Sequence, residues 1–580
     1  MKQKNLFKFI FYTITMILTF TYIIYRIFFT IPITLGIISL ISSILVLFIE
    51  IWESLDFFAY YLNILCVKKI SPKIPDLSNI TQYPDIDVLI ATINEHETLL
   101  KNTVTACKNM NYPDKSKIHI YICDDGNRAN IKKLAENLGV NYLSRITNKN
   151  AKAGNYNHAL NHISSPFVAT FDADMAPTPN FLLTTLPFFY DNTAKFSEKI
   201  KRKKSKKLSA KNNIENMENT ENIENMENTE NMENMKNTGN MEEMGFVQLP
   251  QSFNNPDIFQ LRFKLENKIP FEQEYFYHSI QIAKNATNSA IYCGTNTLFS
   301  RKALDSCNGF ATGTISEDIA TGMLIESNGY KCLALNNVEA YGTAVNDLSG
   351  FVKQRSRWAR GCVQILKKYK ILKNKGLSFS QKIEYLSCIS YWFFGVRRMV
   401  YLLTPLLFSI FGVIIVDCNL ATFISIWLPT YILKRFTLDI FEGNKRSSTW
   451  NKIYETILTP VLCKEVLKEF FGFGNTKFEV TPKFSKTTKM TKTNKKLLAS
   501  HLILLILNII GLVMCLFRIK TTGITVYVLS LLWLISNIFY LTISVIFDSR
   551  TKCSPSPDFV PNKIGVYKKF SVLGIFFGRK

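Results

Sequence analysis

The sequence predicts a Rossmann-like α/β domain inserted between transmembrane α-helices. Nearly uncharged runs of about twenty residues, the length that crosses a bilayer core, occur near both ends of the 580-residue chain. Between them, short β-branched runs alternate with helical stretches, which is the pattern of a largely parallel sheet. A mean hydropathy of +0.06 with 47% hydrophobic residues agrees with soluble and lipid-embedded parts averaged together.

Six apolar runs are candidate membrane spans, and they come in pairs. They cover residues 6–29, 31–51, 391–416, 420–433, 498–519 and 524–547, of which 420–433 is the shortest. The first two can form a tight hairpin around Ile31-Pro32. A signal peptide is the alternative for the first run, but this run lacks a small-residue cleavage site and another span follows it at once.

Paired spans place everything between them on the side of the amino terminus. Lys2, Lys4 and Lys8 mark this side as cytosolic, although Arg518 and Lys520 in a short external loop oppose it. The formal charge of +24 is spread along cytosolic segments without a nucleic-acid-binding motif. We therefore expect contacts with membrane lipid and phosphate-bearing substrates, and none with nucleic acid. The 12 cysteines lack metal-type spacing and are expected to be reduced.

Three predicted strands end in polar residues. The strands cover 86–93, 118–123 and 167–171, and they lead into Asn94-Glu95, Asp124-Asp125-Gly126 and Asp172-Ala173-Asp174. Ligands of open α/β sheets bind beyond the carboxyl ends of strands, so these polar ends are expected to converge on one crevice. Residues 192–243 interrupt the domain with a basic run and Glu-Asn-x triplets, and we expect them to form a disordered surface loop.

Carboxylates and one lysine predict a nucleotide site at this crevice. Asp172 and Asp174 can together hold a hard divalent cation against a diphosphate. Solvated turns are the commoner context of such triplets, but the preceding strand and the second carboxylate cluster favour a metal site. Lys152, in Lys152-Ala153-Gly154-Asn155, is suited to contact a phosphate or a pyrimidine.

Two further groups of residues suit the chemistry of an acceptor. Asp318, in Ser316-Glu317-Asp318, stands before a helical stretch, where a carboxylate can act as a general base on a hydroxyl; a helix N-cap is the alternative. Gln354, Arg357 and Trp358 share one helical face. A guanidinium beside an indole suits diphosphate binding and sugar stacking, although an amphipathic helix on a membrane surface would use the same residues.

Taken together and in this order, these residues resemble the processive family 2 glycosyltransferases, and within them the bacterial cellulose synthases. The match runs from about Pro84 through Phe547. Its motifs are Thr92-Ile93-Asn94-Glu95, Asp124-Asp125-Gly126, Asp172-x-Asp174, Cys293-Gly294-Thr295-Asn296, Ser316-Glu317-Asp318, Gln354-x-x-Arg357-Trp358 and Phe478-Glu479-Val480-Thr481-Pro482-Lys483. Serine replaces the family's threonine at 316. About thirty residues follow Phe547, without a PilZ domain, so no regulation by cyclic di-GMP is expected.

The resemblance implies a GT-A-type cytosolic glycosyltransferase domain at 84–382, two spans within 1–55, and spans with interfacial helices at 383–580. It implies a role for each matched residue. Asp318 would be the catalytic base; Thr92, Glu95, Asp124, Lys152, Asp172, Gln354, Arg357, Thr481 and Lys483 would bind a UDP-sugar; Cys293 and Trp358 would bind the acceptor; and Asp172 and Asp174 would bind Mg²⁺ or Mn²⁺. Residues 478–483 would form a gating loop over the donor; a basic linker on anionic lipid is the alternative.

The implied activity is the inverting, processive polymerisation of glucose from UDP-glucose into a β-glucan, β-1,4 or mixed β-1,3/1,4, which is extruded across the plasma membrane. The resemblance is compatible with accessory subunits but does not identify them. Span residues suited to a hydrated channel are Tyr391, Trp392, Phe393, Arg397, Arg398 and Tyr401, with lipid-facing side chains as the alternative. Alternative products are a curdlan-like β-1,3-glucan and polymers containing N-acetylglucosamine, such as hyaluronan, chitin or poly-N-acetylglucosamine. The alternative outside the enzymes is a membrane transport protein.

Overall fold

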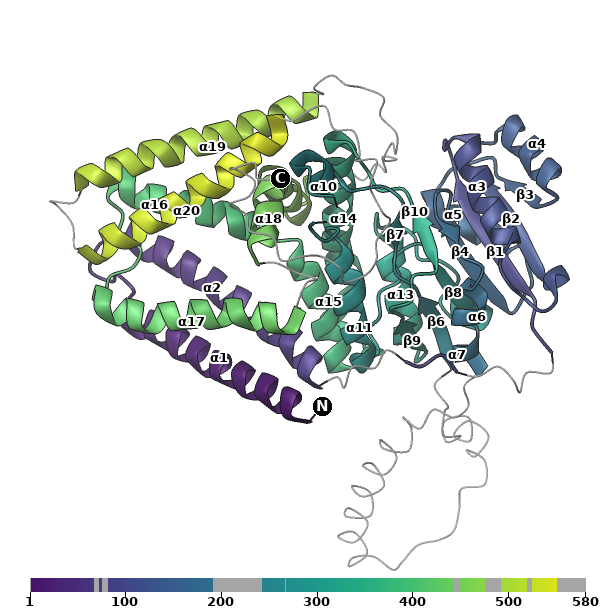
Figure 1. The fold of residues 1–580 in the computed structure, drawn as a ribbon, viewed down its shortest axis with the longest axis horizontal. Helices are drawn as coiled ribbons and strands as arrows, with labels where there is room; N and C mark the ends of the chain where they lie inside the picture. The colour runs from purple at the N-terminus through teal and green to yellow at the C-terminus, as the bar shows by residue number, and fades with distance from the viewer. Residues whose placement is uncertain are drawn as a thin grey trace, which may run out of the picture.

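The computed structural model describes most of the chain, and Figure 1 shows its arrangement. The described residues are 2–66, 72–75, 82–190, 243–266, 268–442, 448–474, 492–518 and 524–549. Thr481 and Lys483 of the predicted gating loop lie outside them, as do residues 192–242 of the predicted insertion and the residues after 549. An α/β domain occupies one end of the molecule, long helices occupy the other, and shorter helices lie between the two (Figure 1).

The α/β domain is built on a seven-stranded sheet with the strand order β3-β2-β1-β4-β8-β6-β9. The strands are β1 (Ile86–Thr92), β2 (Ile118–Asp124), β3 (Asn141–Ser144), β4 (Phe167–Asp172), β6 (Met244–Gln248), β8 (Thr297–Ser300) and β9 (Lys331–Ala334). Only β8 runs antiparallel to its neighbours, β4 and β6. A second sheet has the order β5-β10-β7, with β5 (Ala176–Pro177), β7 (Ser252–Phe253) and β10 (Ala340–Gly342). The prediction of a largely parallel α/β fold is confirmed.

The polar strand ends meet at one edge of the large sheet. β1 pairs in parallel with both β2 and β4, and the register sets Thr92 opposite Asp124 and Ala91 opposite Asp172. The carboxyl ends of all three strands therefore lie side by side, as predicted from the polar residues that follow them.

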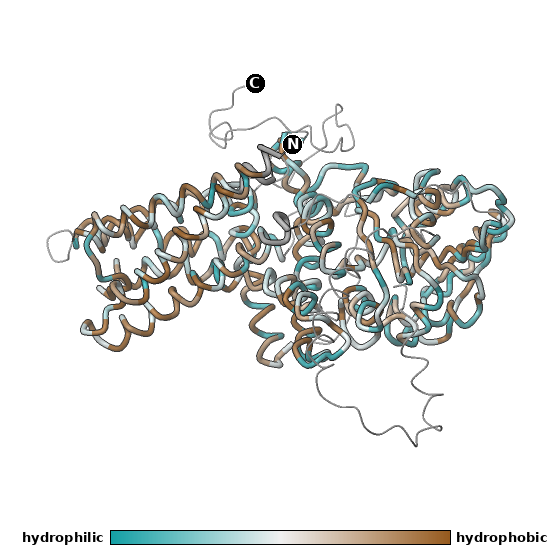
Figure 2. Tube along the Cα trace, turned by 90° about the horizontal axis from the view of Figure 1, so that it is seen from below, coloured by the Kyte–Doolittle hydropathy of each residue, from teal (hydrophilic) through white to brown (hydrophobic). Residues whose placement is uncertain are grey.

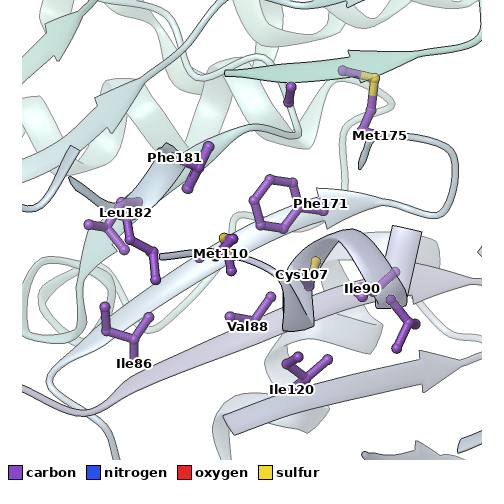
Figure 3. Packing of buried hydrophobic residues seen from close by; sticks show 14 of the residues in the cluster. Ile86, Val88, Ile90, Cys107, Met110, Ile120, Phe171, Met175, Phe181 and Leu182 are labelled. Carbon is purple, nitrogen blue, oxygen red and sulfur yellow. The ribbon is translucent and has the colours of Figure 1, made fainter. Parts of the chain in front are cut away.

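Both faces of this sheet are buried, which holds the strand ends in place. On one face, Ile86, Val88 and Ile90 of β1 pack with Cys107 and Phe181 (Figure 3). These two residues come from α3 (Glu97–Lys108) and α6 (Phe181–Thr185). The opposite face is covered by α5 (Ala151–Leu160) and α12 (Arg301–Ser306), and the remaining helices of the domain include α4 (Ala129–Leu138), α7 (Pro187–Tyr190) and α11 (Gln281–Lys284). Burial on both faces explains why β1 is a nearly continuous apolar run.

A group of helices joins the α/β domain to the long helices. It comprises α10 (Ile258–Phe263), α13 (Glu317–Ser327), α14 (Leu348–Tyr369), α15 (Phe379–Tyr391) and α18 (Ser448–Phe470). Phe259 of α10 stacks on Phe547 at 5.1 Å between ring centroids, and Arg262 donates to the Phe547 carbonyl at 2.6 Å. Phe351 of α14 packs in the same core. One side of α14 is thereby fixed to the long helices.

A glycine sets the distance between α13 and α14. A Cβ atom on Gly361 would lie 2.0 Å from Oγ of Ser316, which immediately precedes α13. Only a residue without a side chain allows this approach. The first turn of α13 therefore sits directly against the middle of α14.

Five described helices are long and apolar enough to cross a membrane, which makes the chain a membrane protein. Their apolar segments are Leu6–Phe29, Ile37–Tyr61, Phe394–Phe411, Thr493–Phe517 and Ile524–Ser549. They belong to α1 (Lys2–Phe29), α2 (Ile37–Cys66), α16 (Phe394–Phe411), α19 (Lys492–Phe517) and α20 (Ile524–Ser549). Figure 2 shows hydrophobic residues predominating along these helices and mixing with hydrophilic ones in the α/β domain.

Three details of the predicted spans differ. The span predicted over 391–416 is α16 alone, because Tyr391 ends α15 and Gly412, with φ +76°, follows the last residue of α16. The second span begins at Ile37, not at residue 31, because residues 30–36 form the turn after α1. Residues 420–433 begin α17 (Leu420–Glu442), which is not among the five apolar helices; its second half carries Lys434, Arg435 and Asp439. α17 nevertheless lies beside α1 (Figure 1), where the hydroxyls of Thr437 and Thr15 are 3.0 Å apart.

Candidate active site

A cavity of about 400 Å³ opens at the carboxyl ends of β1 and β4, between the sheet and α13 and α14. This volume lies within the range of small-molecule sites, about 300 to 1,000 Å³. The cavity brings together predicted residues from six separate stretches of the chain. They are Thr92, Glu95, Lys152, Asp172, Asp174, Cys293, Asp318, Gln354, Arg357 and Trp358.

Asp124 is placed differently from the other predicted residues. Its side chain is fully buried and accepts hydrogen bonds from the backbone N–H groups of Gly126 at 3.0 Å and Arg128 at 2.8 Å, and from the Tyr142 hydroxyl at 3.1 Å. Asp125 lines the cavity instead, paired with Arg145 at 2.6 Å. At the end of β2, the structure therefore presents the second carboxylate to the cavity, and Asp124 supports the turn behind it.

Arg128 connects the carboxyl ends of β1 and β2 through hydrogen bonds. Its Nη2 donates to Oγ1 of Thr92 at 2.7 Å, its Nη1 to the Glu95 carbonyl at 2.7 Å, and its Nη2 also to Asp124 at 3.0 Å. The Thr92 hydroxyl in turn donates to the Glu95 carboxylate at 2.8 Å. The sequence prediction missed Arg128; the available signal was its position four residues after Asp124.

Lys152 lies in the cavity between Asp172 and the backbone of Gly294. It stands in the first turn of α5 and donates to the Asp172 carboxylate and, at 2.6 Å, to the Gly294 carbonyl. Burial acts to lower the pKa of Lys152, but the adjacent Asp172 carboxylate outweighs it and the pKa is raised. A charged ammonium group is therefore held beside Asp172, where it suits a phosphate.

The donor atoms beside Lys152 fit a hard divalent cation. Asp172 and Asp174 both line the cavity, and no cluster of three or more His, Cys, Asp or Glu side chains suited to a metal occurs in the described part of the chain. Mg²⁺ and its substitutes are commonly bound by one or two carboxylates, with substrate phosphates and water completing the coordination. A pair of carboxylates in a cavity of this size matches that requirement.

Asp318 faces Lys152 across a glycine. It lies in the first turn of α13, and its carboxylate is close enough to Gly294 that an added Cβ would be 3.2 Å from Oδ2. Burial raises the pKa of Asp318, while the charges of Lys152 and Arg357 act in the opposite direction. The neighbouring Glu317 also lines the cavity, and burial raises its pKa as well. A carboxylate with a raised pKa in a cavity is suited to accept a proton.

A further ion pair lies beside the predicted face of α14. Arg355 donates to Glu272 at 2.5 Å and to Oε1 of Gln354 at 3.0 Å, and its guanidinium lies 4.2 Å from the centroid of the Trp358 ring. Glu272 and Arg355 both line the cavity, and sequence reasoning missed both. Glu272 lies 83 positions before Arg355, so no local pattern pointed to the pair.

Cys293 contributes its backbone N–H and carbonyl groups and a buried thiol to the wall of the cavity. Its N–H donates to Oε1 of Gln248 at 2.8 Å, and its carbonyl accepts from Gln251 at 3.2 Å. Burial raises the pKa of the Cys293 thiol well above its ordinary value. The thiol therefore stays protonated at neutral pH and is suited to contact a ligand, not to act as a nucleophile.

Polar side chains continue from the cavity into the apolar helices. The Trp392 ring stands 6.2 Å from that of Trp358, edge to face. Beyond it, Arg397 of α16 donates to Asp56 of α2 at 2.6 Å, and the Tyr401 hydroxyl donates to Glu53 at 3.1 Å, while Arg398 donates to the Thr456 hydroxyl at 3.1 Å. The predicted Arg397 and Tyr401 thus face acidic residues of α2 that the sequence prediction did not single out.

The residues around this cavity fall within stretches that match known glycosyl transferase families. Glycosyl transferase family 2 matches residues 87–307, and glycosyl transferase family group 2 matches residues 231–438. The cellulose synthase catalytic subunit (UDP-forming) of Pseudomonas fluorescens (strain SBW25) is 29% identical over 84% of this chain and 59% of that protein. Its namesake from Xanthomonas axonopodis pv. citri (strain 306) is 28% identical over 83% of this chain and 60% of that protein.

The chain spans about three fifths of the length of these two relatives. A solved mannosyltransferase from Pyrobaculum calidifontis, in complex with GDP-mannose and Mn²⁺, aligns with a TM-score of 0.43 at 16% identity, covering 73% of this chain and 98% of that one. Such an alignment describes a distant likeness and decides nothing about chemistry. Over residues 87–438 the chain is therefore similar to glycosyl transferase family 2 and glycosyl transferase family group 2, and over most of its length it resembles the catalytic subunits of bacterial cellulose synthases.

Proposed function

We propose that this protein is a processive, inverting glycosyltransferase that polymerises glucose from UDP-glucose into a β-glucan and extrudes it across the plasma membrane. One observation carries the proposal: Asp318, Lys152 and Asp172 share a single cavity with the Gln354, Arg357 and Trp358 face of α14. A site of this kind holds a charged donor and a hydroxyl acceptor at the same time.

Each side of the cavity has its own task. On the donor side, Lys152, Arg357 and Gln354 bind the diphosphate, and Thr92, Glu95 and the Asp124 turn bind the nucleoside. Asp172 and Asp174 hold Mg²⁺ or Mn²⁺, which would neutralise charge on the leaving diphosphate. On the acceptor side, Trp358 stacks on the terminal sugar and Cys293 contacts it.

Asp318 begins the transfer. Its carboxylate takes the proton of the acceptor hydroxyl, whose oxygen then forms a bond to the anomeric carbon of the donor sugar. The bond between that carbon and the diphosphate oxygen breaks, UDP leaves with the electron pair, and the configuration at the anomeric carbon inverts. Asp318 afterwards releases its proton to solvent. Thr481 and Lys483 would close over the donor before this step.

The path for the product starts at Trp358. Charged groups inside membrane spans pair with one another and commonly mark substrate pathways. The Arg397–Asp56 pair, the Tyr401–Glu53 hydrogen bond and the nearby Trp392 ring supply polar and aromatic groups of the kind a sugar chain meets. With α17 as the sixth crossing, α18 lies on the same side of the membrane as the α/β domain, which we assign to the cytosol.

Incubation of the purified protein with UDP-glucose and with UDP-N-acetylglucosamine, in separate reactions, tests the proposal. We expect UDP release and a polymer with UDP-glucose alone, and linkage analysis should give β-1,4 or mixed β-1,3/1,4 bonds. Incorporation of N-acetylglucosamine would assign the enzyme to another polymer. Absence of UDP release with every donor would remove the enzymatic proposal and leave a transport protein.

The raised pKa of Asp318 predicts the acid side of the pH profile. Because the base must be deprotonated, transfer is lost as the pH falls through the pKa of Asp318, and this loss begins at a higher pH than for an ordinary aspartate. Since the charge of Arg357 lowers that pKa, Arg357→Gln should move the acid limb to still higher pH, besides reducing the maximal rate. Initial rates at saturating donor, measured across a range of pH, give the acid limb of the profile directly. If the acid limb of Arg357→Gln lies at the same pH as that of the wild type, the assignment of Asp318 as the base is contradicted.

Gly294→Ala should impair transfer through its contact with Asp318. Gly294 has φ +83°, and a Cβ there would lie 3.2 Å from Oδ2 of Asp318 and 3.6 Å from Nζ of Lys152. Since a reacting group displaced by 1 Å can cost about 10²-fold, we expect about a tenfold loss in rate for the smaller displacement here. Gly329→Ala is the matched control, because it has φ +90° with nothing within 4 Å. Equal rates in the two variants would show that backbone strain alone matters.

A further inference from the structure

We propose that the Glu272–Arg355 ion pair fixes Trp358 and Gln354 in place and thereby determines how long the enzyme retains its growing chain. The proposal rests on the proposed function, because it takes Trp358 as the residue that stacks on the acceptor. Glu272 and Arg355 are positioning residues in this view: they act on the polymer through the indole and the amide.

The pair is buried and its geometry is closely defined. The side chains of Glu272 and Arg355 are 11% and 5% exposed, and Nη2 of Arg355 donates to Oε2 of Glu272 at 2.5 Å. Glu272 is itself held, because its N–H donates to Oδ2 of Asp257 at 3.0 Å. Asp257 caps α10, the helix that packs on α20. The residue that orients Arg355 is therefore held, through Asp257, at the start of α10.

Arg355 uses separate parts of its guanidinium for separate tasks. Nη1 donates to Oε1 of Gln354 at 3.0 Å, which orients the amide next to it. The Cζ atom of Arg355 lies over the Trp358 ring, 4.2 Å from the centroid, and over the Phe351 ring, 4.6 Å from the centroid. The guanidinium thus lies between two rings, and it covers part of the indole while Trp358 still lines the cavity.

A fixed indole matters more for a polymerase than for an enzyme that transfers one sugar. Each side chain that becomes immobile on binding costs affinity, so an indole that is already held binds a sugar more tightly than a free one. Tighter binding of the chain end lengthens its residence between additions. Chemistry at Asp318 does not need this residence, but repeated transfer to one chain does.

Glu272→Gln tests the proposal. Glutamine keeps the shape of the side chain but removes the charge that orients Arg355, so the guanidinium loses its fixed position against Trp358. We expect the affinity for a gluco-oligosaccharide to fall about tenfold, the scale of a desolvated cation–π contact. UDP affinity should fall much less, because Lys152 and Arg357 still bind the diphosphate when Gln354 loses its fixed orientation. Products should become shorter, and a larger share of the consumed UDP-glucose should appear as free glucose.

Two further variants separate positioning from stability. Glu384→Gln is the matched control, because Lys284 and Glu384 form an equally buried pair at 2.9 Å whose residues do not line the cavity. It should lower the melting temperature comparably without shortening the product. Arg355→Lys keeps the positive charge but loses the plane that lies on the indole, so it should behave like Glu272→Gln.

Oligosaccharide binding is measured on protein without donor, by titration calorimetry. Equal oligosaccharide affinities and product lengths in wild type and Glu272→Gln would overturn the positioning role, and so would equal shortening in Glu384→Gln. Absence of UDP release by the wild type would instead refute the proposed function, while the difference in oligosaccharide affinity would still decide the positioning role.

Discussion

Asp318→Asn should reduce transfer by a factor of about 10² to 10⁴, the contribution that a positioned general base commonly makes. Asparagine keeps the size of the side chain and can still accept the N–H of Ile319, which donates to Oδ1 of Asp318 at 2.9 Å. It cannot take a proton from the acceptor hydroxyl. UDP-glucose affinity and the melting temperature should therefore stay close to those of the wild type, and rapid-quench measurement of a single turnover would isolate the lost step.

Glu317→Gln provides the comparison for Asp318→Asn. Glu317 precedes Asp318 in the same turn of α13, lines the same cavity and has a pKa raised by the same burial. If Asp318 is the base, Glu317→Gln should retain much more activity than Asp318→Asn. If Asp318→Asn loses donor affinity and turnover in parallel, the carboxylate binds the donor or supports the fold, and another group must be the base.

Asp172→Asn and Asp174→Asn should each lower transfer by about 10² to 10³-fold or more, the range seen when a group that stabilises transition-state charge is removed. Both carboxylates line the cavity and Asp172 also pairs with Lys152. Neutral amides are poorer ligands for a hard cation, so UDP binding should lose its dependence on Mg²⁺ or Mn²⁺ in both variants. Calorimetric titration with UDP, with and without Mn²⁺, measures that dependence apart from turnover.

Asp305→Asn is the control for the two aspartates. Asp305 pairs with Arg301 on the surface of the same domain, is 57% exposed and does not line the cavity. It should leave metal-dependent UDP binding and transfer unchanged. Full activity of the wild type after removal of divalent ions with EDTA would refute the metal site altogether.

The strand ends could be predicted because their signal is local. A buried run followed directly by carboxylates identifies the end of β4 without knowledge of the rest of the chain, and Asp172 lies where this pattern placed it. Which of two adjacent carboxylates enters the cavity is not local. It depends on the turn after β2, where Arg128 and Tyr142 draw Asp124 inward and leave Asp125 to the cavity.

Contacts across the chain escaped prediction for the same reason. Lys152 meets Gly294 across 142 positions, and Glu272 meets Arg355 across 83. No periodicity reports such pairs; they follow from how the sheet and α14 pack. Residues 420–433 are apolar, but Lys434 and Arg435 follow them directly, so α17 is less apolar than the other long helices, and its place in the bundle follows from packing on α1.

If the protein elongates a polymer as proposed, the attachment of α10 to the end of α20 limits how that polymer can be advanced. Phe259 of α10 stacks on Phe547 of α20, and Arg262 of α10 donates to the Phe547 carbonyl. The helices that join the α/β domain to the long helices are therefore fixed to α20. A rigid-body rotation of the whole α/β domain against the long helices would break these contacts each time a sugar is added. Movement of the polymer then depends on small displacements of side chains where the product path begins, near Trp358. On heating, the α/β domain and the long helices should unfold in one cooperative transition.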